Sequence, residues 1–188
     1  MNENQELNRN ELIELIRSCF PVDPVPEEVV VDQSDVLNGK SGTCETVLAA
    51  KAFAGKKWPE ITYSYLEGKF NGYPHEIFFF LNDKSFLYYF PAYLLMGFDE
   101  TGSDPYYGEE AAESVCWFLS ERYSQRYVVN LSSDQSAVVA MCLKYFSRHY
   151  RHQWPRDYAM EAYDGYWRQF DPAPPDQKTT NAPTPAKP

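Results

Sequence analysis

The sequence predicts a mainly α-helical fold, with a single compact domain, few short strands and a disordered, proline-rich C-terminal tail. Three observations favour this class. Apolar residues recur at helical spacing in several segments, and most of these segments begin at a residue that can cap a helix. Aromatic residues make up 16% of the 188 positions, which is typical of a packed chain. A chain of this length has room for one domain with a sizeable core, but hardly for two.

The first expected helix is an amphipathic segment near the N-terminus. Its cap is Asn8 or Asn10, and its apolar residues fall on one face at i, i+3 and i+4 spacing. Pro21 ends the helix, because the residue before a proline avoids the helical conformation. The connector that follows contains Val29–Val31, a short run that either forms an edge strand or lies across the core.

Three further segments lead to the middle of the chain. A second helix opens at Ser41 or Thr43 and ends at Gly55, a residue suited to the left-handed conformation that terminates helices. Its expected inward face consists of Val47, Leu48, Ala50 or Lys51, and Phe53. Trp58–Glu60 then has the pattern of a helix start with an early proline. Ile77–Leu81 is a short apolar run that is strand-like.

The next helix is expected from its cap, Asp83, to about Phe98. Aromatic and aliphatic side chains occupy most of its circumference, which is typical of a helix at the centre of a fold. Pro91 lies inside this pattern. Because proline removes a backbone donor and crowds the carbonyl of Leu87, we expect a kink or a break there.

The second half of the chain is expected to contain three more helices. The first covers residues 109–121 and follows a loop over residues 99–108. The second begins at a capping box, Ser132–Gln135, which is the strongest local signal in the sequence, and continues to about Tyr150. The third covers residues 156–170.

The end of the chain differs in composition from the rest. Residues 171–188 are rich in proline and contain no large apolar side chain. Such a segment buries too little surface to offset the entropy lost on ordering. We therefore expect a helical domain over residues 1–170 and a disordered tail over residues 171–188.

The charge and the apolar pattern exclude several classes of partner. The chain has 27 acidic and 17 basic side chains, a formal net charge of −10, which argues against a protein that mainly grips phosphate backbones. The stretch Tyr145–Trp154, where rings alternate with arginines, does not outweigh that charge. Met1–Asn10 lacks the pattern of a signal peptide, and no segment is apolar enough to predict a membrane span. We expect a cytoplasmic protein with neither a nucleic-acid nor a membrane partner.

The nucleophilic and metal-binding residue types form no recognisable motif. The four cysteines are too far apart for a zinc motif, and we expect them to be reduced and structural. They are Cys19, Cys44, Cys116 and Cys142. His149 and His152 could share a helical face, but without a third ligand they favour a solvated helix end. The common phosphate-binding, hydrolase and zinc-protease motifs are absent from the sequence. We predict no catalytic residue, no metal and no cofactor.

Acidic residues cluster in two parts of the chain. Residues 1–37 contain nine acids against Arg9 and Arg17, and residues 99–114 contain six acids and no base. The second cluster is either a solvated loop and helix N-terminus, or a patch that meets a basic partner with tyrosines as anchors. We predict the following partner-binding residues: Asp99, Glu100, Asp104, Tyr106, Tyr107, Glu109, Glu110 and Glu113.

Three sequence blocks carry a resemblance to a known family. They are Cys44 with Phe53–Glu60 (F-x-G-x-x-W-P-E), Tyr88–Leu95 (Y-Y-x-P-A-x-L-L), and Leu131–Gln135 (L-S-x-x-Q) with a closing Tyr166–Trp167. Over about Asn8–Phe170 the chain resembles a family of small bacterial proteins catalogued as a domain of unknown function. The family carries no agreed catalytic residues, so the resemblance implies no site.

These observations predict a non-catalytic binding protein. We expect an immunity, or antitoxin-like, protein that neutralises a cognate bacterial toxin by direct binding to a basic toxin domain. The acidity and the clustered acids favour this function, because electrostatic complementarity speeds the capture of a basic partner. The alternatives are a housekeeping adaptor or accessory domain, and an enzyme with an unrecognised site.

Overall fold

The computed structural model describes residues 7–70, 74–98, 105–120, 130–150 and 152–172. These residues form eight α-helices and three 3-10 helices and contain no strand, so the predicted mainly helical class is confirmed, although the few short strands are not seen there. The α-helices are α1 (Arg9–Cys19), α2 (Gln33–Leu37), α3 (Cys44–Phe53), α4 (Tyr63–Glu67), α5 (Asp83–Met96), α6 (Pro105–Leu119), α8 (Ser133–His149) and α9 (Gln153–Gly165). The 3-10 helices are η1 (Trp58–Glu60), η2 (Pro74–Phe80) and η4 (Trp167–Phe170).

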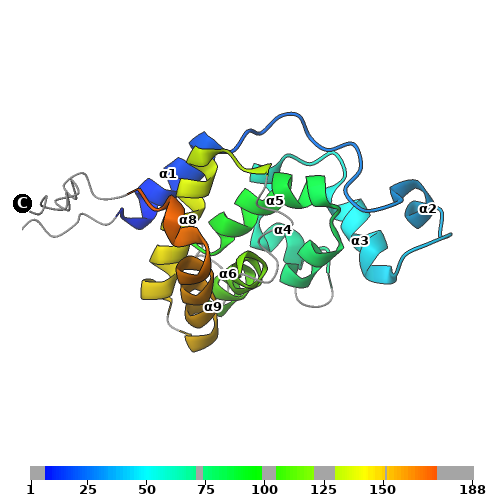
Figure 1. The fold of residues 1–188 in the computed structure, drawn as a ribbon. Helices are drawn as coiled ribbons and strands as arrows, with labels where there is room; N and C mark the ends of the chain where they lie inside the picture. The colour runs from blue at the N-terminus through cyan, green and yellow to red at the C-terminus, as the bar shows by residue number, and fades with distance from the viewer. Residues whose placement is uncertain (1–6, 71–73, 99–104, 121–129, 151, 173–188) are drawn as a thin grey trace, which may run out of the picture.

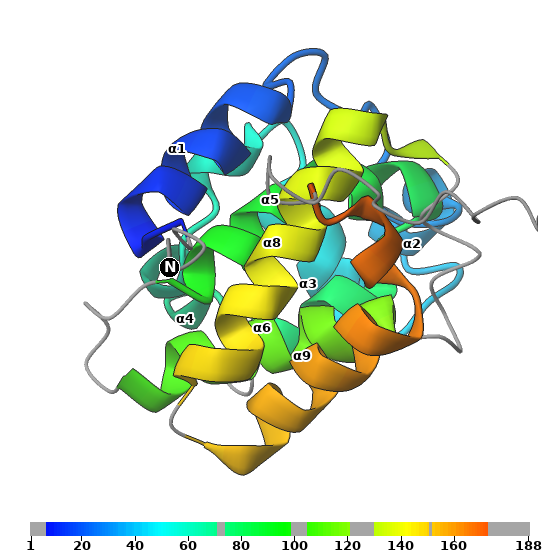
Figure 2. The same cartoon turned by 60° about the vertical axis from the view of Figure 1, so that its left-hand side comes forward.

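The helices are arranged around α5 (Figure 1). On one side, α9 packs against both α6 and α8, and α1 contacts both α8 and α5. On the other side, α3 and α4 contact η2, and α2 packs against α3 at the far end of the molecule (Figure 1). Figure 2 shows α8 crossing in front of α5 and beside α9.

Helix α5 is central, as the sequence predicts. Nine of its residues are buried, and Tyr89, Tyr93 and Leu94 are fully inaccessible to solvent. Its cap is Asn82 rather than Asp83, because the Asn82 side chain accepts a hydrogen bond of 2.9 Å from the Ser85 backbone N–H. The helix continues through the buried Pro91, so the predicted break does not occur. Dense packing on all sides stabilises the turn that the proline weakens.

Two tyrosines of α5 anchor the preceding segments of the chain. The Tyr88 hydroxyl donates a hydrogen bond of 2.6 Å to the carbonyl of Val22. The Tyr89 hydroxyl donates to the carbonyls of Phe53 and Lys56, at 2.7 and 2.9 Å, where α3 ends. Burial raises the pKa of Tyr89 well above its ordinary value, so this hydroxyl keeps its proton. These bonds satisfy carbonyls that the end of a helix leaves without an intrahelical donor.

The first turn of α5 anchors the connector between α1 and α2. The side chains of Asn82 and Ser85 both donate to the carbonyl of Glu28, each at 2.8 Å. Val29 and Val30 next to it are completely buried. Of the two conformations that the sequence allows for this run, the structure has the one that lies across the core.

The run Ile77–Leu81, predicted to be strand-like, instead belongs to η2 and the turn after it. Phe78 explains the difference, because its ring centroid lies 4.2 Å from those of both Phe86 and Tyr93 and 5.6 Å from that of Phe118. A tight helical turn directs Ile77, Phe78 and Leu81 into the core together, whereas a strand would alternate them between two faces.

Helix α3 begins and ends as predicted, and its predicted inward face is confirmed at Ala50 and Phe53 but not at Leu48. Thr43 caps it, and Gly55 follows it with a φ of 70°. The buried residues are Ala49, Ala50, Ala52 and Phe53. Leu48, predicted to face inward, is exposed. Small alanine side chains let α3 approach η2 closely, so the side of α3 with the smaller residues faces the core.

The C-terminal helices differ from the prediction mainly at their starts. The capping box at Ser132 is confirmed. Helix α6 begins at Pro105, inside the segment predicted to be a loop, because proline favours the first position of a helix. Helix α9 begins at Gln153 and ends at Gly165, and η4 then buries Trp167, whose indole N–H donates to the carbonyl of Leu119 at 3.0 Å.

Asp171 joins the folded domain, although the predicted tail begins there. Its carboxylate accepts a hydrogen bond of 2.6 Å from the ammonium group of Lys144 on α8 and another from the Tyr163 hydroxyl on α9. Burial and the Asp171 carboxylate together raise the pKa of Tyr163 to about 12. The predicted tail beyond Pro172 lies outside the described residues.

Gly97 and Gly68 provide a matched test of the packing around α5. Both follow a helix with right-handed backbone angles. A Cβ at Gly97 would lie 2.6 Å from the Ala112 Cβ and 2.6 Å from the Tyr150 hydroxyl, whereas a Cβ at Gly68 meets nothing nearer than 3.7 Å. Gly97→Ala should cost about 1–3 kcal/mol of unfolding free energy through overpacking, and Gly68→Ala should be neutral or slightly stabilising. Urea unfolding measures both; equal effects would contradict the close approach of α5 and α6.

The C-terminal boundary gives a second prediction. A chain truncated after Pro172 should keep its melting temperature, because the removed segment has no large apolar side chain. Introducing Asp171→Ala into the truncated chain should cost about 1 kcal/mol, or roughly 2–4 °C, since Lys144 and Tyr163 lose their shared acceptor. Differential scanning calorimetry compares the two. A large loss on truncation alone would place the boundary beyond Pro172.

Candidate functional site

Only part of the predicted partner-binding segment lies within the residues that the structure describes. Three of its acids, Asp99, Glu100 and Asp104, lie outside the described residues. Three more residues lie on the first turns of α6: Glu109, as predicted, and Tyr106 and Tyr107, which the sequence predicts to lie in the loop before it. The proline at the start of α6 extends the helix over these positions.

The last two predicted residues, Glu110 and Glu113, are half-buried on α6. Helix α6 packs against both α5 and α9, so the positions after its first turns face other helices in part. Burial raises the pKa of the Glu113 carboxyl above its ordinary value. A carboxylate that burial disfavours is less available to a partner than one surrounded by water.

A second acidic region lies on α2, α3 and the connector before them. Residues 27–48 contain five acids and one base. Three of the large apolar side chains that the described residues expose are found here: Val31 is 66% exposed, Leu37 45% and Leu48 39%. We call this region the α2–α3 surface, and we define it as Glu27, Glu28, Val31, Asp32, Asp35, Leu37, Cys44, Glu45 and Leu48.

Backbone hydrogen bonds fix the α2–α3 surface to the core. The amide N–H of Asn82 donates to the carbonyl of Val29 at 2.9 Å, and the amide of Val29 donates to the side chain of Gln33 at 2.6 Å. Asp32 turns the chain into α2 with a φ of 51°, a left-handed conformation that aspartate tolerates better than most residues. The acids near Val31 are therefore held on an ordered backbone.

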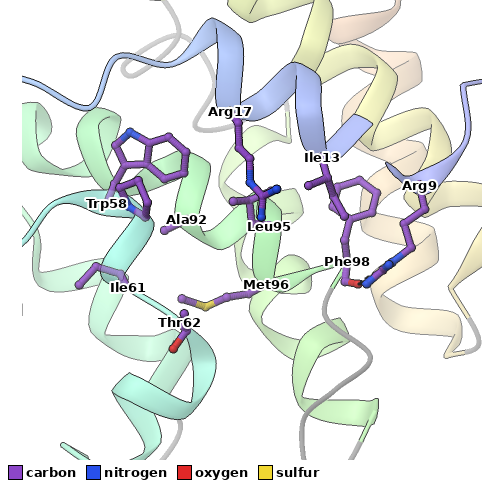
Figure 3. Close-up of a pocket in the computed structure, with 11 residues that line it drawn as sticks. Arg9, Ile13, Arg17, Trp58, Ile61, Thr62, Ala92, Leu95, Met96 and Phe98 are labelled. Carbon is purple, nitrogen blue, oxygen red and sulfur yellow. Dashed lines mark hydrogen bonds between the residues drawn. The ribbon is translucent and has the colours of Figure 1, made fainter. Parts of the chain in front are cut away.

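A pocket of about 280 Å³ lies between α1, α5 and η1 (Figure 3). Arg9 and Arg17 of α1 line it, with Ile13 between them and with Arg17 between Ile13 and Trp58 (Figure 3). Leu95 and Met96 of α5 form part of its apolar wall. The predictions from sequence do not include this pocket. The one available signal is the i, i+4, i+8 spacing of Arg9, Ile13 and Arg17, which places the three residues on one helical face.

Two hydrogen bonds hold the ends of the pocket. The Arg9 guanidinium donates through Nε, at 2.8 Å, and through Nη2 to the carbonyl of Phe98. The indole N–H of Trp58 donates to the carbonyl of Pro21 at 3.0 Å. Both bonds bridge segments distant in sequence, so the pocket walls are fixed by tertiary structure.

The cysteines and histidines form no metal centre within the described part of the chain. The ring of His149 stacks on that of Tyr145, with centroids 4.1 Å apart. Cys116 and Cys142 are buried, and burial raises the pKa of both thiols well above the ordinary value. In the same residues no helix combines the length and the apolarity that a membrane span requires.

Comparison with protein families gives one match. A family model described as "Family of unknown function (DUF6714)" matches residues 8–171. The chain belongs to this family. Neither the comparison with curated proteins nor that with solved structures finds a match.

The extent of the DUF6714 match follows the folded domain. It begins at Asn8, which caps α1, and ends at Asp171, which is bonded to α8 and α9. The α2–α3 surface and the pocket both lie within the matched residues. They are therefore part of the domain that defines the family.

Glu113 provides a test of the buried environment on α6. Because burial raises its folded-state pKa, the neutral form is favoured, and stability is lost as the pH rises from the ordinary pKa through the raised one. At pH 7, Glu113→Gln should therefore raise the melting temperature, and the gain should shrink towards pH 4, where the wild-type carboxyl is protonated. The exposed Glu161 supplies the control, Glu161→Gln. A Glu113→Gln variant that matches this control at both pH values would show that Glu113 is solvated.

Proposed function

We propose that this DUF6714 protein is a non-catalytic, cytoplasmic binding protein of the immunity type, which neutralises a bacterial toxin by binding a basic domain of it. The observation that carries the proposal is the α2–α3 surface, where exposed apolar side chains lie among carboxylates. Apolar residues at the centre of a contact and charged residues around them are the usual composition of a protein–protein interface.

The charge of the surface defines the partner. The exposed acids Glu27, Glu28 and Asp32 lie within four residues of the exposed Val31 in sequence, and the nearest base, Lys40, already pairs with Asp35 at 3.5 Å. A partner that buries Val31, Leu37 or Leu48 must bring basic side chains to the acids, or leave carboxylates desolvated without a counter-charge. A basic surface with an apolar centre meets both requirements.

The anchoring of the surface favours tight binding. Its backbone is bonded to the first turn of α5 through Glu28 and Val29, so little conformational entropy is lost when a partner docks. The excess of acid also attracts a basic partner before contact, and it raises the association rate at low salt. Rapid capture is what neutralising a toxin requires.

The segment from Asp99 to Glu113 remains the contact region predicted from sequence. Its half-buried members, Glu110 and Glu113, contribute less to such a contact than the exposed acids of the α2–α3 surface. The experiment therefore tests the Asp99–Glu113 segment and the α2–α3 surface with separate sets of variants.

Charge reversal tests the proposal. The partner is captured from a lysate of the native host, identified by mass spectrometry, purified and measured by surface plasmon resonance at low and high salt. Glu27→Lys with Glu28→Lys should slow association about tenfold or more at low salt and less at high salt, because screening shortens the reach of the attraction to about 8 Å at 0.15 M. Leu37→Ala should speed dissociation at least fivefold, corresponding to about 1 kcal/mol. The reversal of Asp104 and Glu109 forms the second arm.

The matched controls lie on α9, where Glu161, Asp164 and Met160 are exposed. Glu161→Lys with Asp164→Lys changes the net charge by the same amount, and Met160→Ala removes a comparable apolar side chain. If both charge reversals slowed association equally, the effect would depend only on the net charge of the chain. That result would refute the assigned surface. The partner should also arrest bacterial growth when expressed alone and not when co-expressed with this chain; a harmless partner would favour the adaptor alternative.

A further inference from the structure

We propose that the pocket between α1 and α5 binds a small organic anion, a carboxylate carried on an apolar chain, with Arg17 contacting the carboxylate. This site is separate from the α2–α3 surface and does not depend on the proposed function. Figure 1 places α1 and α2 at opposite ends of the molecule.

The distribution of charge points to an anionic ligand. Residues 1–37 contain nine acids and two bases, and both bases line this pocket. Arg9 and Arg17 are eight residues apart on α1, which corresponds to about 12 Å along the helix axis. In a chain with a net charge of −10, the pocket is thus lined by two guanidinium groups and no carboxylate.

The two arginines have different roles. Nε and Nη2 of Arg9 are bonded to the Phe98 carbonyl, so this side chain is held as part of the wall. Arg17 has only a surface ion pair with Glu14, at 2.8 Å, and both side chains of that pair are more than half exposed. Surface pairs contribute little to stability, so Arg17 can exchange Glu14 for a ligand at small cost. Figure 3 shows its side chain extending from α1 towards Leu95.

The walls define the rest of the ligand. The apolar lining consists of Ile13 on α1, Leu95 and Met96 on α5, and Trp58 and Ile61 at the η1 end, with the Met96 side chain extending towards Thr62 (Figure 3). These are aliphatic and aromatic groups, which favour an apolar chain over a sugar or a nucleotide. The volume of about 280 Å³ is just below the range typical of pockets for drug-sized ligands, so the occupant is a small molecule.

Sodium octanoate is a suitable probe, because it combines a carboxylate with an unbranched apolar chain. Isothermal titration calorimetry with the full chain, below the critical micelle concentration, should show saturable binding of octanoate. 1-Octanol, which has the same chain without the charge, should bind more weakly, and octylamine, with the opposite charge, should bind more weakly still. Octylamine binding as tight as that of octanoate would overturn the proposal, since it would reflect the net charge and not the two arginines.

Arg17→Gln identifies the contact. It should weaken octanoate binding about tenfold or more, because a charge-assisted hydrogen bond is lost, and should leave 1-octanol binding unchanged. Arg168→Gln is the matched control, since Arg168 is also exposed and also pairs with an acid on the preceding turn, Asp164 at 3.4 Å. Thermal melts establish that both variants are folded. No binding of octanoate to the wild type, or equal binding to wild type and Arg17→Gln, would refute the assignment.

Discussion

The rest of the structure depends on one constraint, the burial of α5 on nearly every side. A helix in this position satisfies its own backbone, but the polar side chains along it must find partners inside the protein. Those of α5 and its cap are directed to backbone carbonyls of other segments. Tyr88 bonds to Val22, Tyr89 to the end of α3, and Asn82 and Ser85 to Glu28. The helix that supplies much of the core thus also fixes the irregular parts of the N-terminal half.

The two candidate sites of this DUF6714 protein both derive from that arrangement. The connector that carries Val31 is ordered because its backbone is bonded to the start of α5. The pocket lies where α1 meets the C-terminal half of α5, and Arg9 and Arg17 of α1 line it together with Leu95 and Met96 of α5. One end of α5 therefore supports the surface that we propose to bind a protein, and the other supports the pocket that we propose to bind a small molecule.

Local signals in the sequence predict most of the longer helices, but they predict neither α2, which lies in the expected connector, nor the two sites. Ser132 is predicted as a cap, and Asn8 and Thr43 are each one of two predicted candidates, because capping depends on residues three positions apart. The predicted inward face of α3 is wrong at Leu48, because the elements that pack against the helix decide whether a leucine or an alanine faces the core. Ile77–Leu81 has no periodicity that distinguishes a strand from a tight turn. The exposure of Val31 and the alignment of Arg17 with Leu95 arise only from tertiary structure, so a single sequence does not reveal them.

The bond between Arg9 and the carbonyl of Phe98 has a consequence for synthesis on the ribosome. Its two residues are 89 positions apart, and Gln135 on α8 bonds to the carbonyl of Cys19 across 116 positions. At the usual rate of translation, the first of these intervals takes roughly 5–20 s. During that interval the bond cannot form, because its acceptor has not yet been synthesised. Helix α1 therefore completes its native contacts only after Gln135 on α8 has been made.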